Sequence, residues 1–440
     1  MSLVMKTIED FICIHACERP DHPAIIKDDK VISYHALWQR VSERARGYVP
    51  GRGYVLSNTQ DIDFVIDYLS IHAAGAVAVP VASDLSADML AQIHQTVDKA
   101  LPMEDGMEPL ADILFTTGTT GTQKGVMISH RALLADAENL IAAQGYSPDT
   151  VFVICGPLQH IGSLSKMWPV FHEGGTLVLL DGLRDQEAFF RAFDYPSKCM
   201  ATFLVPASIR LLLQWGRKEM ASLADKIDFI ETGAAPMPQG DLDLLRMILP
   251  HTRLYNTYAS TETGIICTYD YQHHPCIAGC LGPSMKHSHV FITQKGTVAC
   301  QGATLMSGYI GDPEATAQVL HDDTLWTSDL GELDTEGNLH LTGRLGDTIN
   351  IGGYKIAPTD VENAAMAMKG MKDCICTKVE SPVFGLTLKL YYVSDQPLSK
   401  KEIARFLAQR LERWQVPNLY EKTDHIARTF NGKLDRKKYM

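Results

Sequence analysis

The segment LFTTGTTGTQKGVMISH, Leu114–His130, is the most informative part of the chain. Its hydroxyl residues alternate with glycines and precede a lysine: Thr116, Thr117, Gly118, Thr119, Thr120, Gly121 and Lys124. Glycine has no Cβ, so the backbone can turn sharply and approach a ligand closely. Successive N–H groups in such a turn form a concave anion site, and a lysine adds a charge suited to phosphate. The segment therefore predicts a phosphate-holding loop.

The loop differs from the common nucleotide P-loop, which requires a Ser or Thr directly after the lysine, whereas Gly125 follows Lys124. Taken alone, the segment is also compatible with a flexible turn between two strands. It resembles the signature loop of the adenylate-forming superfamily, Y-T-S-G-T-T-G-x-P-K-G-V, which includes acyl-CoA synthetases, luciferase and adenylation domains of peptide synthetases. Thr117 replaces Ser and Gln123 replaces Pro, and neither change removes a hydroxyl, a glycine or the lysine.

Length and composition bound the class of protein. A chain of 440 residues exceeds what one hydrophobic core usually supports, so two or more domains are expected. The formal charge of −12 argues against a nucleic-acid partner, which would require a basic patch. Asp67 and His72 interrupt the longest apolar stretch, so no membrane span is expected. Ten cysteines without a regular framework predict reduced thiols and a cytoplasmic location.

The hydrophobic periodicity predicts alternating strands and helices. Helices are expected over residues 8–18, 34–48, 61–74, 131–144 and 399–413, and strands over 24–27, 31–34, 76–81, 113–115, 151–154, 176–180 and 227–230. Such alternation predicts a mostly parallel α/β sheet. Strands near residues 290–309 predict a β-rich subdomain, and residues 347–440 have a β and α pattern of their own. Compared with the family, one βα unit is expected to be missing after Ala82.

Further segments resemble family motifs that surround the acyl group and the adenine. Pro157, Leu158 and His160 match P-L-F-H-x-x-G, with Gly162 one position before the glycine of the motif. This match implies that His160 lies beside the acyl group. Amino-acid-activating relatives carry an Asp here, and its absence argues against an α-amino acid substrate. Small residues at Gly233, Ala234 and Ala235 match the turn that lines the adenine, and a strand-to-helix turn with Pro236 near the first helical position is the alternative.

The segment Leu254–Gly264, LYNTYASTETG, resembles N-x-Y-G-x-T-E. It places Asn256, Tyr258, Thr261 and Glu262 at family positions, with Ala259 in place of the glycine. Magnesium prefers hard oxygen ligands and often takes one or two carboxylates plus substrate phosphates, which suits Glu262. An isolated Thr-Glu pair would more often cap a helix.

The second half of the chain adds nucleotide and hinge motifs. Asp329 occupies the Asp position of Y-x-T-G-D, where a carboxylate would accept from both hydroxyls of a ribose. Residues 341–361 resemble the family's hinge segment, which implies a ribose or phosphate contact for Arg344, a hinge at Asp347 and a path for pantetheine past Gly353. Asn350 replaces a lysine of many members.

Near the end, ARTFNGKLDR resembles P-K-T-x-x-G-K-[IL]-x-R, which implies that Lys433 reaches the substrate carboxylate and the α-phosphate. A solvated basic tail is the alternative for this region. The resemblance implies catalytic roles for Lys433, His160, Thr119 and Glu262, with Glu262 also the metal ligand.

The resemblance implies a multi-layer α/β N-terminal domain, residues 1–345, and a small mobile α+β C-terminal lid, residues 346–440. The implied reaction is AMP-forming activation of a carboxylic acid with ATP and Mg²⁺, followed by transfer to a thiol, most plausibly that of coenzyme A. An enzyme that loads an acyl carrier protein, and a degenerate nucleotide-binding scaffold, are the alternatives. A compact chain also resembles the o-succinylbenzoate–CoA ligases, but no residue identifies the acid, and the oligomeric state stays open.

Overall fold

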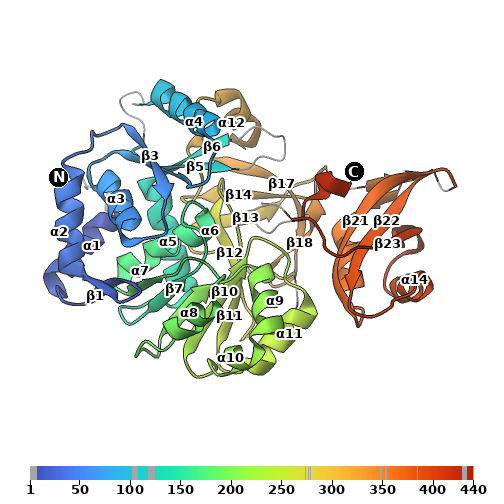
Figure 1. Cartoon of the computed structure of the whole chain (residues 1–440). Helices are drawn as coiled ribbons and strands as arrows, with labels where there is room; N and C mark the ends of the chain where they lie inside the picture. Colours follow the sequence, from blue (N-terminus) through green and yellow to red (C-terminus); the bar gives the residue numbers. More distant parts are fainter. Residues whose placement is uncertain are drawn as a thin grey trace.

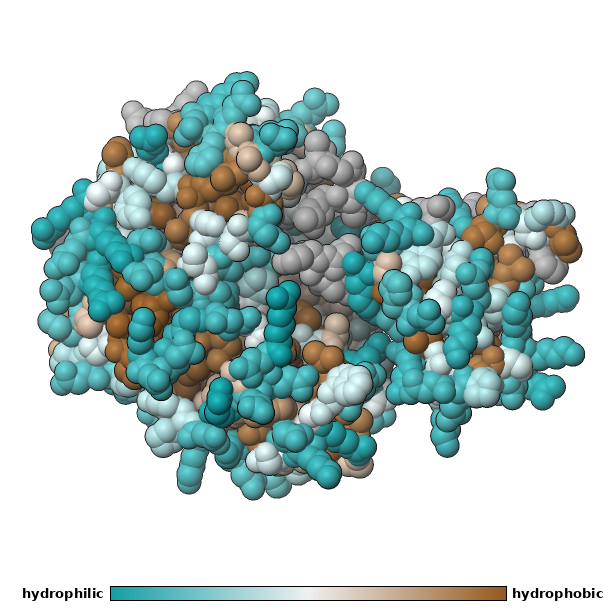
Figure 2. All heavy atoms as spheres, viewed as in Figure 1, coloured by the Kyte–Doolittle hydropathy of each residue, from teal (hydrophilic) through white to brown (hydrophobic). Residues whose placement is uncertain are grey.

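A computed structural model describes residues 7–101, 108–116, 124–346, 349–351, 354–428 and 434–439, apart from residues 273, 276, 278 and 384. The chain forms a large N-terminal part and a smaller C-terminal part beside it (Figure 1). Figure 2 shows hydrophilic side chains spread over both parts, with apolar side chains gathered in smaller patches. No helix in the described residues is long and apolar enough to cross a membrane.

An eight-stranded sheet forms the centre of the N-terminal part. In sheet order its strands are β12 (Gly264–Asp270), β11 (Arg253–Ser260), β10 (Ile227–Gly233), β9 (Met200–Phe203), β7 (Val151–Ile154), β8 (Thr176–Leu179), β1 (Pro23–Lys27) and β2 (Lys30–Ser33). The pairs from β11 to β1 are parallel, and the outer pairs β11–β12 and β1–β2 are antiparallel. The prediction of a mostly parallel α/β sheet is confirmed for this layer.

A second sheet carries the two strands that flank the Thr/Gly loop. Its order is β15 (Gly308–Tyr309), β6 (Lys124–Ser129), β5 (Leu110–Thr116), β4 (Val77–Ala82) and β3 (Gly53–Asn58). Strands β3, β4 and β5 are parallel, whereas β5 and β6 pair antiparallel across the loop. The predicted phosphate loop therefore joins two adjacent strands.

Helices cover both sheets, and one apolar core joins them. The helices on this core are α1 (Ile8–Glu18), α2 (Tyr34–Ala45), α3 (Ile62–Ala73), α5 (His130–Gln144), α6 (Ile161–Leu164) and α7 (Met167–Glu173). A separate core lies under α8 (Gln186–Ala192), α9 (Pro206–Trp215), α10 (Arg217–Ala221) and α11 (Gln239–Ile248) on the other face of the large sheet. Helix α4 (Ala87–Ala100) packs on the second sheet, and α12 (Pro313–Val319) follows β15.

Local chemistry explains where several of these helices begin and end. The Ser129 hydroxyl accepts from the Ala132 N–H at the start of α5, and Gly145 ends the helix with φ 74°. The Asp61 carboxylate accepts from the Phe64 N–H at the start of α3. These helices agree with the sequence-based expectations to within a few residues.

The predicted β-rich region forms a third sheet. It contains β13 (Ser288–Ile292), β14 (Thr297–Gly302), β16 (Leu320–His321), β17 (Thr324–Leu333) and β18 (Leu339–Arg344). Tyr309, expected to close this region, instead lies on β15 in the second sheet, where it pairs with Val126. The chain thus returns to the strand that follows the Thr/Gly loop.

The C-terminal part has its own apolar core, built from residues between Ile349 and Tyr420. Its elements are β19 (Ile349–Ile351), β20 (Tyr354–Ile356), α13 (Pro358–Met366), β21 (Met371–Ser381), β22 (Gly385–Ser394), α14 (Lys400–Ala408), η1 (Arg413–Gln415), β23 (Leu419–Lys422) and η2 (Arg436–Tyr439). The predicted helix over 399–413 is too long, because α14 ends at Ala408 and a separate turn follows. This α+β body matches the expected fold class.

Candidate active site

The predicted site residues converge on the edge where the central parallel strands end. Strands β7, β9, β10 and β11 all point their carboxyl ends to this edge. The turn with His160 follows β7, and the turn with Gly233, Ala234 and Ala235 follows β10. Ligands of open α/β sheets bind outside the carboxyl ends of the strands. The topology therefore brings the predicted acyl and adenine motifs together.

Most of the Thr/Gly loop, including Thr117, Gly118, Thr119, Thr120 and Gly121, lies outside the described residues. Its two ends are described. Thr116 and Lys124 are partners in the β5–β6 register, and the Thr116 hydroxyl lies 3.4 Å from the Lys124 carbonyl oxygen. The Lys124 ammonium lies 4.5 Å from the centre of the Tyr309 ring, within cation–π range.

Tyr309 also connects Lys124 to Glu262. The Tyr309 hydroxyl donates to Glu262 Oε1 at 3.0 Å, and burial together with Glu262 raises the pKa of this tyrosine. Glu262 lies with Thr261 in the turn between β11 and β12, where the Thr263 N–H donates to the Ser260 hydroxyl. The alternative of a helix cap is therefore wrong for the Thr-Glu pair, because this segment is a hairpin turn.

The chemistry of Glu262 fits a magnesium ligand. Its carboxylate is only partly buried, and one oxygen is held by Tyr309. Carboxylate oxygens are hard ligands, and Mg²⁺ commonly uses one or two of them together with phosphate oxygens. A cationic side chain, Lys124, contacts the same tyrosine, so an anionic ligand such as a phosphate is favoured beside the carboxylate.

Three predicted nucleotide-binding residues form a second group. The Tyr258 hydroxyl donates to Asp329 Oδ2 at 2.6 Å, and Arg344 Nε lies 3.4 Å from Asp329 Oδ1. Arg344 Nε also donates to the Ser328 hydroxyl at 3.0 Å. Asp329 and Arg344 are register partners on β17 and β18. Burial, and then the negative charge of Asp329, raise the pKa of Tyr258, so its hydroxyl stays a donor that orients the carboxylate.

The turn after β10 has unusual backbone geometry. Ala234 has φ 66°, a left-handed conformation that an L-residue adopts at a cost of about 1 kcal/mol. A Cβ on Gly233 would lie 2.7 Å from the Thr257 carbonyl oxygen, so only glycine fits there. The alternative that placed Pro236 near the first helical position is wrong, because α11 begins at Gln239 with Pro238 as its N-cap.

His160 is the N-cap residue of α6, the helix that follows the turn after β7. Burial lowers the pKa of His160, so the imidazole is neutral at neutral pH. A neutral, mostly buried ring is suited to line an acyl pocket.

Asn256 is held by hydrogen bonds within the protein. Its side-chain amide is buried and donates to the Tyr271 hydroxyl at 3.0 Å and to the Cys280 carbonyl oxygen at 3.1 Å. These bonds use the amide N–H groups and leave the amide oxygen able to accept, so a nucleotide contact of Asn256 stays a prediction.

The remaining predicted residues, Asp347, Gly353 and Lys433, lie outside the described residues. Both flanks of the Lys433 segment are fixed. Arg428 donates two hydrogen bonds to the Asp373 carboxylate, at 2.8 and 2.7 Å. Arg436 donates two to Glu362, at 2.6 and 2.8 Å. The Arg436–Glu362 pair is bidentate, with one guanidinium nitrogen on each carboxylate oxygen, and such pairs are strong and directional.

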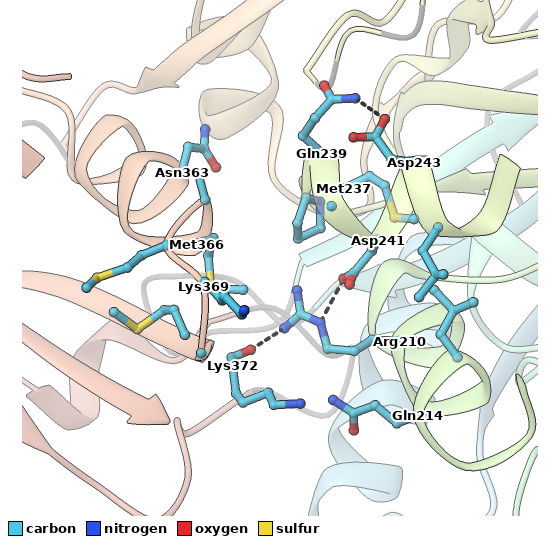
Figure 3. A pocket seen from close by; sticks show the side chains of 18 of the residues that line it. Arg210, Gln214, Met237, Gln239, Asp241, Asp243, Asn363, Met366, Lys369 and Lys372 are labelled. Atoms are coloured by element: carbon cyan, nitrogen blue, oxygen red, sulfur yellow. Dashed lines mark hydrogen bonds and ion pairs between the residues drawn. The ribbon is translucent and has the colours of Figure 1, made fainter. Parts of the chain in front are cut away.

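A groove of about 1230 Å³ separates the two parts of the chain (Figure 3). Helices α9 and α11 form one wall, and residues 363–372 form part of the other. Arg210 crosses it: its Nε donates to Asp241 at 2.8 Å and its Nη1 donates to the Lys372 carbonyl oxygen at 3.2 Å. Lys369 and Lys372 line the C-terminal wall together with Asp395, which pairs with the Lys372 ammonium at 2.7 Å.

Sequence reasoning missed one charged pair at this edge. Lys166 and Glu231 are buried, and Lys166 Nζ donates to Glu231 Oε1 at 2.6 Å. The available signal was a lysine inside the apolar stretch around α6 and α7 and a glutamate inside strand β10. Neither residue belongs to a motif, and they lie 65 positions apart.

Comparison with known families and sequences gives consistent results. The model of a family described as AMP-binding enzyme matches residues 95–310. The 2-succinylbenzoate–CoA ligase of Staphylococcus aureus is 27% identical over 399 residues, which cover 88% of this chain and 78% of that protein. The corresponding ligase of Staphylococcus epidermidis is 28% identical over 341 residues, covering 76% and 70%.

Solved structures show the same fold. ATP-bound MatB from Rhodopseudomonas palustris superimposes with a TM-score of 0.86 at 20% identity, covering 99% of this chain and 98% of that one. The o-succinylbenzoate CoA synthetase MenE from Bacillus subtilis, in complex with the acyl-adenylate OSB-AMP, gives a TM-score of 0.83 at 21% identity, covering 98% and 97%.

Proposed function

The chain belongs to the adenylate-forming superfamily of AMP-binding enzymes, and on this premise we propose that it is an AMP-forming acid–CoA ligase. It activates a carboxylic acid with ATP to an acyl-adenylate, releases pyrophosphate and transfers the acyl group to the thiol of coenzyme A. The observation that carries this proposal is a pair of polar groups that link the end of β11 to the other two sheets. Lys124–Tyr309–Glu262 reaches the second sheet, and Tyr258–Asp329–Arg344 reaches the third.

Each group has a separate task with ATP. Asp329, oriented by Tyr258, accepts from the ribose hydroxyls, and Arg344 binds ribose or phosphate oxygens. The turn of Gly233, Ala234 and Ala235 lines the adenine, since only small residues fit beside it. The loop of Thr116 to Gly121 and Lys124 holds the phosphates through N–H groups, hydroxyls and an ammonium.

The chemical difficulty is that a carboxylate must attack the α-phosphorus of ATP, and both are anions. Mg²⁺ held by Glu262 supplies Lewis-acid stabilisation of phosphate charge. Lys433 and Thr119 stabilise the charge that develops on the α-phosphate in the transition state. His160, neutral and mostly buried, positions the acyl group. No covalent enzyme nucleophile is required, so positioning and electrostatics account for the rate.

The C-terminal lid controls the second half of the reaction, the transfer to the thiol. Rotation of the C-terminal lid about Asp347 withdraws Lys433 and opens a path past Gly353 for the pantetheine thiol. Such a motion is a gating step. A carrier-bound pantetheine would use the same path, so an acyl carrier protein is the alternative acceptor. A scaffold is disfavoured, because it has no need of the matched polar groups listed above.

The acid is an aryl or acyl acid without an α-ammonium group. Amino-acid-activating relatives hold that ammonium with an Asp at the His160 motif, and this chain has no Asp there. 2-Succinylbenzoate, the acid in the relatives' names, is dicarboxylic and belongs in that class of the acids to test. The nine described cysteines are free thiols, which supports a cytoplasmic location.

Carboxylate-dependent ATP–pyrophosphate exchange tests the first half-reaction. We expect exchange with one class among aryl, fatty, dicarboxylic and amino acids, and loss of exchange in Lys433→Ala. Lys437→Ala is the matched control, because Lys437 is an exposed lysine of the same basic run. Formation of a thioester with free CoA then separates a CoA ligase from a carrier loader. Tight ATP binding without exchange by any acid would contradict the proposal and favour a scaffold.

A further inference from the structure

The buried pair Lys166–Glu231 lies beside Phe203 near the carboxyl ends of β9 and β10. Lys166 separates α6 from α7 and is 2% exposed, whereas Glu231 lies on β10 and is 0% exposed. The ammonium donates to Glu231 Oε1 at 2.6 Å. Burying two charges is costly unless their remaining hydrogen-bonding capacity is also used.

Contacts through Phe203 place the pair at the carboxyl ends of the strands. Lys166 Nζ lies 5.1 Å from the centre of the Phe203 ring, and Phe203 is the register partner of Glu231. A Cβ on Gly162 would lie 3.2 Å from Phe203 Cε1, and a Cβ on Gly233 would lie 3.9 Å from its Cε2. The ring thus lies between the turn of His160 and the turn proposed for adenine, and the charged pair adjoins it.

Neighbouring described residues do not use all of the hydrogen-bonding capacity of the pair. Among the described residues, Glu231 Oε2 has no hydrogen-bond partner, although it is buried. The Tyr146 hydroxyl is also buried without a described partner, and burial together with the charge of Glu231 raises its pKa. Buried polar atoms in folded proteins are nearly always hydrogen-bonded. The unsatisfied carboxylate oxygen therefore points to a group that arrives with the ligand.

The chemistry of the pair selects the kind of group. A carboxylate oxygen accepts, so it requires a donor, and the ammonium has further N–H groups for an acceptor. The pair is neutral as a unit, so a second carboxylate of the acid would add an uncompensated buried charge. A hydroxyl or an uncharged amino group both donates and accepts without adding charge.

We infer that the pair Lys166–Glu231 is the specificity determinant of the acyl pocket and selects an acid with a neutral hydrogen-bonding substituent, a hydroxyl or uncharged amine, over its unsubstituted or dicarboxylic analogue. This inference rests on the proposed function. The pair binds the substituent away from the reacting carboxylate and takes no part in the chemistry.

The test uses ATP–pyrophosphate exchange on the full-length protein with matched triplets of acids. Within each triplet, hydrogen, hydroxyl or carboxylate occupies the same position, on benzoate at each ring position and at the end of short alkanoates. We expect kcat/KM for the best hydroxylated acid to exceed that of its two analogues by about tenfold or more, because a site built for a polar group rejects acids that leave it unsatisfied.

The double variant Lys166→Met/Glu231→Leu replaces the pair by apolar side chains of similar size, and we expect it to prefer the unsubstituted acid. The control is Asp228→Asn/Arg253→Met, which removes an ion pair of 2.6 Å at the amino-terminal ends of β10 and β11, away from Glu231. This control variant should keep the substrate preference of the unaltered protein.

The outcomes separate the two proposals. If the unaltered protein catalyses exchange but prefers the unsubstituted or dicarboxylic acid, this inference is overturned and the proposed function stays in place. An unchanged preference in a folded double variant would overturn it as well. Absence of exchange with every acid would overturn the proposed function and, with it, this inference.

Discussion

At the scale of single residues, the site depends on backbone approach and on oriented carboxylates. Gly233 leaves no room for a Cβ, since that atom would lie 2.7 Å from the Thr257 carbonyl oxygen. Ala234 next to it keeps a left-handed φ of 66°. Strained backbone persists where the surroundings fix it, and such positions cluster at ligand sites.

We expect Gly233→Ala to destabilise the N-terminal part by about 1–3 kcal/mol, because the clash is with backbone that must shift. The same change should weaken ATP binding, since the turn lines the proposed adenine site. Gly240→Ala, in helix α11 with nothing within 4 Å of the added Cβ, is the matched control and should leave both properties unchanged or slightly improved. Thermal unfolding with and without ATP measures both effects. Equal melting temperatures for the two variants would refute the argument.

Asp329 is the second residue whose role is directly testable. Replacing it by Asn keeps the shape but removes the charge that accepts from the ribose hydroxyls. Hydrogen bonds to charged groups contribute about 1.5–3 kcal/mol, so the Kd for ATP should rise by about tenfold or more. Asp323→Asn changes an exposed aspartate just before the same strand and should not alter the affinity. Isothermal titration calorimetry that finds equal affinities would remove Asp329 from the site.

At the scale of secondary-structure elements, a buried network fixes the strand that leads into the Thr/Gly loop. His72 on α3 lies 3.1 Å from Glu9 on α1, through Nδ1, and 3.1 Å from Asp112 on β5, through Nε2. The Tyr68 hydroxyl donates to Asp112, and Trp168 donates to Tyr68. Burial disfavours the charged imidazole, but the carboxylates Asp112 and Glu9 outweigh this effect and raise the pKa of His72 to about 10.

This network predicts a pH dependence of stability. The folded state holds a proton on His72 that the unfolded chain releases near pH 6.5. The contribution of this proton to the free energy of unfolding is therefore full below about pH 6.5 and disappears as the pH rises through about 10. His72→Gln should remove this dependence. At pH 7 it should cost about 3–5 kcal/mol, because two buried carboxylates lose their counter-charge.

Urea unfolding between pH 6 and 10, about the range in which the two states differ in protonation, compares the proteins. His94→Gln is the control, since His94 is an exposed histidine on α4. Parallel stability curves for the unaltered protein and His72→Gln would contradict the assignment of a charged His72.

At the scale of the whole molecule, two bodies meet across a groove lined by both apolar and polar side chains. The C-terminal apolar core draws its members from residues between Ile349 and Tyr420, whereas the cores of the N-terminal part contain none of them. Described contacts across the groove include the hydrogen bond from Arg210 to the Lys372 carbonyl oxygen. Separate cores joined by polar contacts favour independent unfolding.

Differential scanning calorimetry should therefore resolve two transitions. At about 0.7 kcal/mol per residue, residues 346–440 would absorb about 65 kcal/mol and residues 1–345 about 240 kcal/mol. ATP should raise mainly the midpoint temperature of the larger transition, because most of the residues proposed to bind ATP lie in residues 1–345. One cooperative transition with the summed enthalpy would show that the boundary near residue 345 is wrong.

Candidate residues that lie in local motifs could be predicted from the sequence. Tyr258, Asp329 and Arg344 were each predicted from their own segments, and the structure brings them within hydrogen-bonding or ion-pairing range. Contacts between distant segments could not be predicted. Lys166 meets Glu231 only because the fold brings the residues between α6 and α7 beside β10. The direction of the Asn256 amide depends on Tyr271, which follows β12. Such pairings follow from the packing of the sheets and not from spacing along the chain.

The central claim, attack of a carboxylate oxygen on the α-phosphorus, is tested most directly by isotope transfer. An acid labelled with ¹⁸O in its carboxylate, incubated with the protein, ATP, Mg²⁺ and CoA, should yield AMP that carries one ¹⁸O atom. The oxygen that attacks phosphorus stays with AMP when the thiol displaces it. Unlabelled AMP, or label recovered in inorganic phosphate, would contradict formation of an acyl-adenylate.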